Sequence, residues 1–261
     1  MSNSKIEKAK QKQERIGSTN YNNFGSKMTI IKYTNTSNIL VKFENGYTVK
    51  ANYLNFKTGE IKSPYDKSVY NIGYIGEGKY KPKINSIKTE QYNSWYDMMK
   101  RCYSNVLHKK RPTYIGCTVC DEWHNFQNFA KWYDKNYYEI ENQRMCLDKD
   151  ILHKGNKIYS PETCIFVPQN INSLFTKTNA LRGKYPIGVR FRKDCNKYNS
   201  CCSNGNKKRI CLGVYNTPEE AFYVYKNYKE NLIKQIADKY KNKIPQKLYN
   251  AMYKYKVEIT D

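Results

Sequence analysis

Apolar and polar residues alternate along the N-terminal third of the chain in the manner of short β-strands. The alternating runs cover residues 28–33, 39–43 and 47–51, and they are rich in β-branched and aromatic residues. Asn45-Gly46 separates the last two runs, and Asn-Gly favours a two-residue hairpin turn in which both central residues have positive φ. The pattern predicts a small antiparallel β-domain over residues 17–80.

Several short strands separated by polar turns favour a small barrel, and the pattern resembles an SH3-like β-barrel. Such a barrel often serves as an accessory module, so the resemblance implies little about function. Residues 1–16 are rich in lysine and predict a basic segment that is either simply solvated or lies along a phosphate backbone. Residues 81–90, which include Pro82, predict a linker.

The spacing of apolar residues becomes helical in the middle of the chain. One such stripe predicts a helix ending near residues 102–103, and a second predicts a helix over residues 122–133 whose aromatic side chains form core. The first stripe is Tyr92, Trp95, Met98 and Met99, and the second is Trp123, Phe126, Phe129 and Trp132. Residues 146–168 predict a β-hairpin turning at 154–157, with a buried run at 164–167, and residues 170–176 predict a helix after it.

Three short β-runs and a long helix are predicted in the C-terminal third. The strands cover residues 187–193, 197–203 and 208–215. Thr217-Pro218-Glu219-Glu220 is a typical helix start, with Thr as N-cap, Pro in the first turn and Glu three residues after the cap. Further helices are predicted over 231–241 and 244–254. The whole pattern predicts a multidomain α+β protein divided into residues 1–16, 17–80, 85–178 and 183–261.

The charge of the chain indicates a polyanionic partner. Lys and Arg number 46 against 23 Asp and Glu, a net charge of +23, and the chain also contains 26 tyrosines. Lysines and arginines that neutralise phosphates release counterions, and aromatic rings can stack on bases. No apolar run approaches a membrane span and no signal peptide opens the chain, so we expect a cytosolic protein with reduced cysteines and no membrane or small-molecule partner.

A set of motifs between residues 188 and 221 resembles the AP2 DNA-binding domain. The motifs are Gly188-Val189-Arg190-Phe191-Arg192, Lys197-Tyr198 and Leu212-Gly213-Val214-Tyr215-Asn216-Thr217-Pro218-Glu219-Glu220-Ala221. The resemblance implies a three-stranded sheet that lies in the major groove of double-stranded DNA and is backed by a helix. The family's stacking tryptophans are missing, because their positions fall near Asp194 and at Cys211, so the base preference does not carry over.

The resemblance places DNA-contacting residues on this sheet. They are Arg190, Arg192, Lys193, Lys197, Tyr198 and Arg209. Arg190 and Arg192 are two residues apart, so both side chains should point to one face of the strand. The alternative is a basic sheet face that is only solvated.

A second set of motifs, over residues 92–175, resembles the HNH-type module of phage and intron-associated homing endonucleases. They are Trp95-x-x-Met98-x-x-Arg101-Cys102-Tyr103, Tyr114-Ile115-Gly116-Cys117-Thr118-Val119-Cys120-Asp121-Glu122-Trp123, and Leu147-Asp148-Lys149-Asp150 followed by Pro161-Glu162-Thr163-Cys164. The resemblance implies a ββα hairpin that holds one divalent metal ion, Mg²⁺ or Mn²⁺, for phosphodiester cleavage. It also implies a phage-encoded protein of the bacterial cytosol.

The catalytic pattern of that family is only half present. The resemblance makes Asp148 and Asn172 the metal ligands, whereas Lys149 occupies the position of the general-base histidine and Thr163 that of the orienting asparagine. Lysine ordinarily titrates near pH 10.4 and is a poor base at pH 7 unless burial lowers its pKa, although it can neutralise a phosphate. None of the three histidines replaces the missing base convincingly.

Cys117-x-x-Cys120 has the spacing of a metal-binding pair, and Cys102 and Cys164 could complete a Cys₄ zinc site. Buried cysteines are also common as small hydrophobic residues.

Two functions therefore compete. The first is a homing-type DNA endonuclease, and the second is a non-catalytic, sequence-specific DNA-binding protein with a regulatory or anti-defence role and a degenerate HNH module. RNA binding is disfavoured, because nothing matches an RNA-recognition signature.

Overall fold

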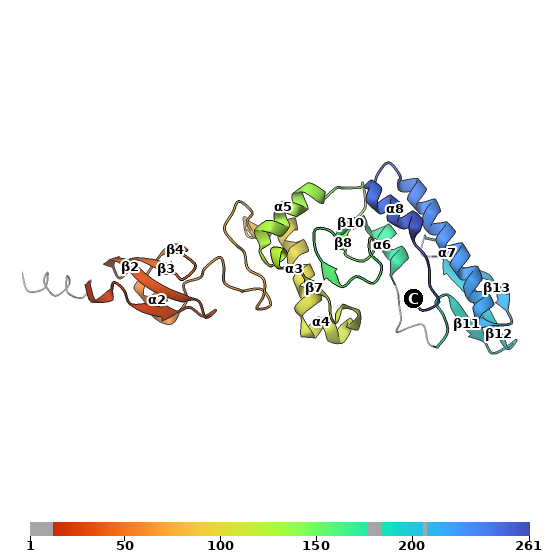
Figure 1. The fold of residues 1–261 in the computed structure, drawn as a ribbon, viewed down its shortest axis with the longest axis horizontal. Helices are drawn as coiled ribbons and strands as arrows, with labels where there is room; N and C mark the ends of the chain where they lie inside the picture. Colours follow the sequence, from red (N-terminus) through yellow and green to blue (C-terminus); the bar gives the residue numbers. More distant parts are fainter. Residues whose placement is uncertain (1–12, 177–183, 206–207) are drawn as a thin grey trace, which may run out of the picture. The chain divides into compact units, whose positions relative to one another are not determined.

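The computed structural model describes residues 13–176, 184–205 and 208–261, which form an α+β fold as predicted (Figure 1). The chain forms two compact units. Unit 1 comprises the chain up to Ile115 together with Val119–Tyr133, and unit 2 comprises Gly116–Thr118 and Asp134–Asp261. The predicted basic segment 1–16 lies largely outside the described residues.

Unit 1 opens with an antiparallel sheet in the order β1-β2-β3-β4. Its strands are β1 (Thr19–Tyr21), β2 (Lys27–Asn35), β3 (Asn38–Phe43) and β4 (Thr48–Ala51). The hairpin predicted at Asn45-Gly46 joins β3 to β4, but of these two residues only Gly46 has a positive φ, of 91°. The connection is therefore longer than the predicted two-residue turn, and it closes with a hydrogen bond from the Phe43 amide to the Tyr47 carbonyl.

The predicted barrel is wrong, because the described strands form an open sheet rather than a closed one. After β4, the Asn52 side chain caps helix α2 (Tyr53–Thr58), which ends at Gly59 with φ of 74°. The chain then continues through turns that add no strand to the sheet among the described residues. Helix α2 contributes Phe56 to the core of the sheet, alongside Met28, Ile30 and Val41.

The predicted linker at 81–90 contains a hairpin of two short strands. Strands β5 (Lys83–Ile84) and β6 (Ile87–Lys88) pair across Asn85 and Ser86. Helix α3 (Glu90–Tyr103) then follows as predicted, with Thr89 as its N-cap. The remaining helical segments before β7 are α4 (Asn105–Lys110) and the 3₁₀ turn η1 (Pro112–Tyr114).

The second predicted helix begins later than expected. The backbone before it forms the 3₁₀ turn η2 (Asp121–His124), and helix α5 runs from Phe126 to Asn136. Tyr74 prevents an earlier start, because its amide donates to the His124 carbonyl and its carbonyl accepts from the Phe126 amide, each at 2.9 Å. The aromatic stripe is core as predicted, with Trp123, Phe126 and Phe129 fully buried.

A ββα arrangement forms the first part of unit 2, but its strands pair differently from the prediction. Strand β8 (Met145–Asp148) pairs antiparallel with β10 (Ile165–Pro168), and helix α6 (Gln169–Phe175) follows directly. Strand β9 (Ile158–Tyr159) is not the partner of β8, because it pairs with β7 (Thr118–Val119). The predicted simple hairpin is thus a long loop between β8 and β10, closed by the buried run at 164–167.

The C-terminal part contains the predicted three-stranded sheet and a long helix. The antiparallel order is β11 (Val189–Arg192), β12 (Lys197–Ser203) and β13 (Arg209–Tyr215). Helix α7 (Pro218–Tyr240) begins with the predicted capping box of Thr217 and Glu220, and α8 (Gln246–Lys254) follows. The helix predicted at 231–241 is present, as the C-terminal part of the continuous helix α7.

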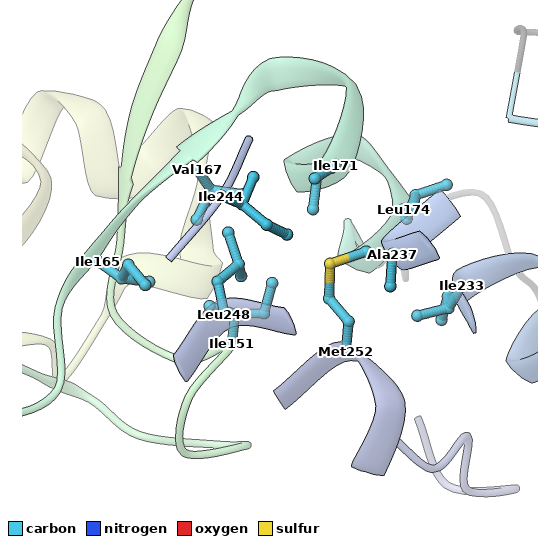
Figure 2. Packing of buried hydrophobic residues seen from close by; sticks show 10 residues of the cluster. All are labelled: Ile151, Ile165, Val167, Ile171, Leu174, Ile233, Ala237, Ile244, Leu248 and Met252. Atoms are coloured by element: carbon cyan, nitrogen blue, oxygen red, sulfur yellow. The ribbon is translucent and has the colours of Figure 1, made fainter. Parts of the chain in front are cut away.

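Helix α7 belongs to two hydrophobic cores. Its N-terminal half, through Ala221, Phe222 and Tyr225, packs on the three-stranded sheet. Its C-terminal half contributes Ile233 and Ala237 to a second core with α8 and the ββα arrangement (Figure 2). That core also contains Ile151, Ile165, Val167, Ile171, Leu174, Ile244, Leu248 and Met252. The ββα arrangement therefore shares its core with the C-terminal helices.

Candidate nucleic-acid interface

One face of the three-stranded sheet is basic and exposed. Cross-strand pairing places Arg190 opposite Asn199 and Arg192 opposite Lys197, and Asn199 in turn lies opposite Val214 of β13. Directly paired residues share a face of the sheet, and positions two apart on a strand do so as well. The exposed residues that this register gathers on one face are Arg190, Arg192, Lys197, Cys211 and Val214, and Arg209 is exposed at the start of β13.

The opposite face of the sheet is covered by α7. Val189 and Cys202 are buried there, with Ala221, Phe222 and Tyr225 of the helix packed against them. Gly188, with φ of 81°, has no room for a side chain, because a Cβ would lie 2.1 Å from the ring of Tyr225. Hydrophobic packing on this face leaves the basic face, which we call the sheet face, directed to solvent.

Two of the predicted DNA-contacting arginines differ in their surroundings. Arg192 forms an ion pair with Asp194, including a hydrogen bond of 3.1 Å from its Nε atom, and this contact raises the pKa of Arg192 and lowers that of Asp194. Arg190 forms no ion pair with any described residue, and the same holds for Lys193, Lys197 and Arg209. Arg190 thus presents a guanidinium group that is open to an external anion.

The remaining predicted contact, Tyr198, lies among aromatic rings. Its ring centroid is 5.3 Å from those of Tyr185 and Phe191, and it packs against the core beneath the sheet. Two polar residues on the sheet face were not identified as candidates from the sequence. They are Asn199 and Cys211, which contact each other through an Sγ–Oδ1 distance of 2.9 Å. Strand alternation from Lys197 is the signal that could have identified Asn199.

The HNH-like residues surround the loop between β8 and β10. Asp148 ends β8, and its Oδ1 atom accepts hydrogen bonds from the amides of Asp150 and Ile151 at 3.0 and 2.8 Å. Burial, together with the neighbouring Asp150 carboxylate, raises the pKa of Asp148 to about 6 despite these bonds. The carboxylate therefore already caps the loop backbone.

Lys149 and Thr163 hold the same loop in shape. The Lys149 side chain is buried, and its Nζ atom lies 3.0 Å from Oδ2 of Asp150 and 2.8 Å from the Asn156 carbonyl oxygen. The Thr163 hydroxyl donates to the Ile158 carbonyl at 2.7 Å. Both side chains thus make structural contacts within the loop.

The predicted metal ligands lie on several different elements of the fold. Asn172 lies half-buried on α6, following β10 as predicted. Of the four cysteines, Cys102, Cys117 and Cys164 are buried and Cys120 is half-buried. Across residues 13–176, 184–205 and 208–261, no group of three or more His, Cys, Asp or Glu residues is arranged to hold a metal ion. The zinc and divalent-metal sites accordingly stay predictions.

Comparison with known proteins gives no match. No family model, curated protein or solved structure matches the chain. In the described part of the chain, no helix is long and apolar enough to cross a membrane.

Proposed function

We propose that the protein binds double-stranded DNA through the sheet face of β11, β12 and β13. The observation that carries the proposal is the row of exposed Arg190, Arg192 and Lys197 on adjacent strands, with Arg209 at the far end of the sheet opposite Ser203 and α7 covering the other face. Three strands span about 10 Å between the outer two, and the major groove is about 12 Å wide. The sheet therefore has the width and charge to enter that groove.

The arginines can contribute both affinity and base recognition. A guanidinium group presents a planar fork that matches O6 and N7 of guanine, and it also neutralises phosphates. Arg190 is open to this interaction, whereas Arg192 must exchange its Asp194 partner for DNA. We therefore expect Arg190 to contribute more than Arg192.

The test measures binding to duplex DNA for Arg190→Ala, with Lys239→Ala as the control because Lys239 is exposed on α7 outside the sheet. Loss of an arginine that reads a base should raise Kd at a preferred site by about fivefold or more, since such a contact contributes about 1–3 kcal/mol. Equal binding by wild type, Arg190→Ala and Lys239→Ala would contradict the use of this face.

Metal-dependent cleavage is the second candidate function, supported by Asp148 on β8 and Asn172 on α6 within a ββα arrangement. The residues present fit a catalytic metal ion poorly. The Asp148 carboxylate caps two backbone amides, and the buried Lys149 is held in the loop where the family has its base. These contacts favour the alternative of a non-catalytic DNA-binding protein with a regulatory or anti-defence role.

Incubation of the protein with its flanking DNA and Mg²⁺ or Mn²⁺ distinguishes the two. We expect no cleavage by the native protein. Cleavage that both Asp148→Ala and Asn172→Ala abolish, without loss of DNA binding, would instead establish the nuclease. The double substitution Lys149→His with Thr163→Asn supplies a base that titrates near neutral pH and an amide to orient it, so gained activity would identify a degenerate nuclease.

A further inference from the structure

The β5–β6 hairpin in unit 1 exposes two isoleucine side chains to solvent. Ile84 and Ile87 are 59% and 74% exposed, and they are cross-strand partners. Paired residues share a face of a hairpin, so the two side chains form one continuous apolar patch next to the turn. Lys83 and Lys88 form the neighbouring pair and lie on the opposite face.

The turn at the end of this hairpin is tight. Asn85 and Ser86 both have positive φ, of 48° and 65°. Positive φ at both central residues is the mark of a two-residue type I′ turn, which matches the natural twist of a hairpin. The two isoleucines therefore flank a narrow tip with no loop to cover them.

Both stems of the hairpin are anchored to helices of unit 1. On the incoming side, Gln127 of α5 accepts from the Tyr80 amide at 3.0 Å and donates to the Tyr80 carbonyl at 2.9 Å. On the outgoing side, the Thr89 amide donates to the Pro82 carbonyl at 3.1 Å, while the Thr89 hydroxyl caps α3. An isolated two-stranded hairpin is marginally stable in water, so these anchors hold the tip in one conformation before binding.

The chain segment that forms the hairpin and leads into it is strongly basic. Residues 79–88 contain four lysines and no acidic residue: Lys79, Lys81, Lys83 and Lys88. The first three also line a hollow of about 470 Å³ beside Ile84. An exposed apolar tip beside lysines is complementary to a polyanion that also has an apolar surface. DNA has both, because its phosphates are anionic and its stacked bases are apolar.

We propose that Ile84 and Ile87 form a wedge that enters a base step of duplex DNA from the minor groove, while the nearby lysines contact the flanking phosphates. Apolar side chains inserted in this way unstack one step and kink the duplex by about 20–90°. The inference rests on the proposed DNA binding and adds a second contact, which deforms DNA rather than reading its major groove.

The test measures DNA bending by energy transfer between dyes at the ends of a duplex, and unstacking by 2-aminopurine fluorescence. Wild type should shorten the end-to-end distance and raise the fluorescence. The double substitution Ile84→Ala with Ile87→Ala should lose both signals and keep the salt dependence of binding. Leu54→Ala is the matched control, because Leu54 is 67% exposed on α2, outside the hairpin. Ile84→Met with Ile87→Met should retain bending.

The lysines are tested separately. Lys81→Gln with Lys83→Gln should reduce the slope of log K against log salt by about 1.8, since each phosphate contact contributes about 0.9. An unchanged slope would exclude these lysines from the contact.

Each other outcome is decisive. Bending by the alanine double variant equal to that of wild type, or binding by wild type without bending, would overturn the wedge and leave the proposed function intact. If the alanine double variant bends DNA normally but changes its oligomeric state, the tip is a protein contact, and the wedge is overturned. Absence of any DNA binding by wild type would overturn both.

Discussion

At the residue scale, the ion pair between Arg192 and Asp194 limits what Arg192 can offer to DNA. Both side chains are exposed, and solvent screens the attraction between exposed charges, so the ion pair is weak. Asp194 also places a negative charge where phosphates would approach. The Asp194 carboxylate thus competes with DNA for the guanidinium group of Arg192 on the sheet face.

Asp194→Asn should therefore tighten duplex DNA binding, by up to about fivefold for release of the arginine alone. Fluorescence anisotropy with labelled duplex measures the change. Glu258→Gln removes the same charge from an exposed position near the C-terminus and is the control. Weaker binding by Asp194→Asn would show that Asp194 positions Arg192 instead of competing with DNA.

The Asp148 carboxylate makes stability depend on pH. Its pKa is raised to about 6 in the folded chain, whereas an unfolded aspartate titrates near 3.8. Folding therefore favours the protonated form, and the stability that this provides is complete below pH 3.8 and is lost as the pH rises through 6. Asn at this position keeps the Oδ1 acceptor for the two loop amides and does not titrate.

We expect the free energy of unfolding of wild type to fall relative to that of Asp148→Asn between pH 4 and pH 7, by on the order of 2–3 kcal/mol. Urea unfolding with EDTA present measures the difference at each pH. A difference that stays constant with pH would mean that Asp148 is ionised as easily in the folded chain as in the unfolded one.

At the scale of elements, α7 joins the sheet face to the ββα arrangement. Its first turns pack on β11, β12 and β13, and its last turns pack with α8, β10 and α6. The C-terminal segment adds a second connection. Val257 is buried in the core beneath the sheet, and Asp261 forms an ion pair with Lys154 of the β8–β10 loop at 2.8 Å. DNA held by the sheet is thus positioned against one continuous structure.

Asn231→Pro tests this connection at an exposed position in the middle of α7. Proline in a helix interior removes a hydrogen bond and costs about 3 kcal/mol or more, so both cores should lose stability together. Hydrogen exchange of the sheet and of α6 measures the two cores separately. Asn231→Ala is the control, and loss of protection in only one core would show that α7 does not couple them.

At the scale of the whole molecule, the net charge of +23 should dominate non-specific binding. If the protein neutralises 6–10 phosphates, its affinity for DNA should fall by about 10³–10⁵ between 50 and 200 mM salt. Titrations at several salt concentrations measure the slope. A binding constant that barely changes with salt would remove the electrostatic basis of the proposal.

Local features of the chain were predictable from the sequence because neighbouring residues determine them. The capping box of Thr217 and Glu220 identified the start of α7, and strand alternation identified Arg190 and Arg192 as exposed on one face of β11. The helical spacing of Trp95, Met98 and Met99 likewise identified α3 and its buried face. In each case the hydrogen bonds or the periodicity lie within a few residues, so the sequence alone contains the information.

Only the tertiary structure decided which elements meet. Strand β8 pairs with β10 and not with β9, which is closer in sequence. Tyr74 delays the start of α5, about fifty residues later in the chain, by hydrogen bonding to the backbone of His124 and Phe126. The open sheet of β1–β4 and the core shared by α6, α7 and α8 depend in the same way on distant contacts. Such pairings depend on long-range hydrophobic packing and on backbone hydrogen bonds between distant segments, and a local pattern of residues does not specify the partner.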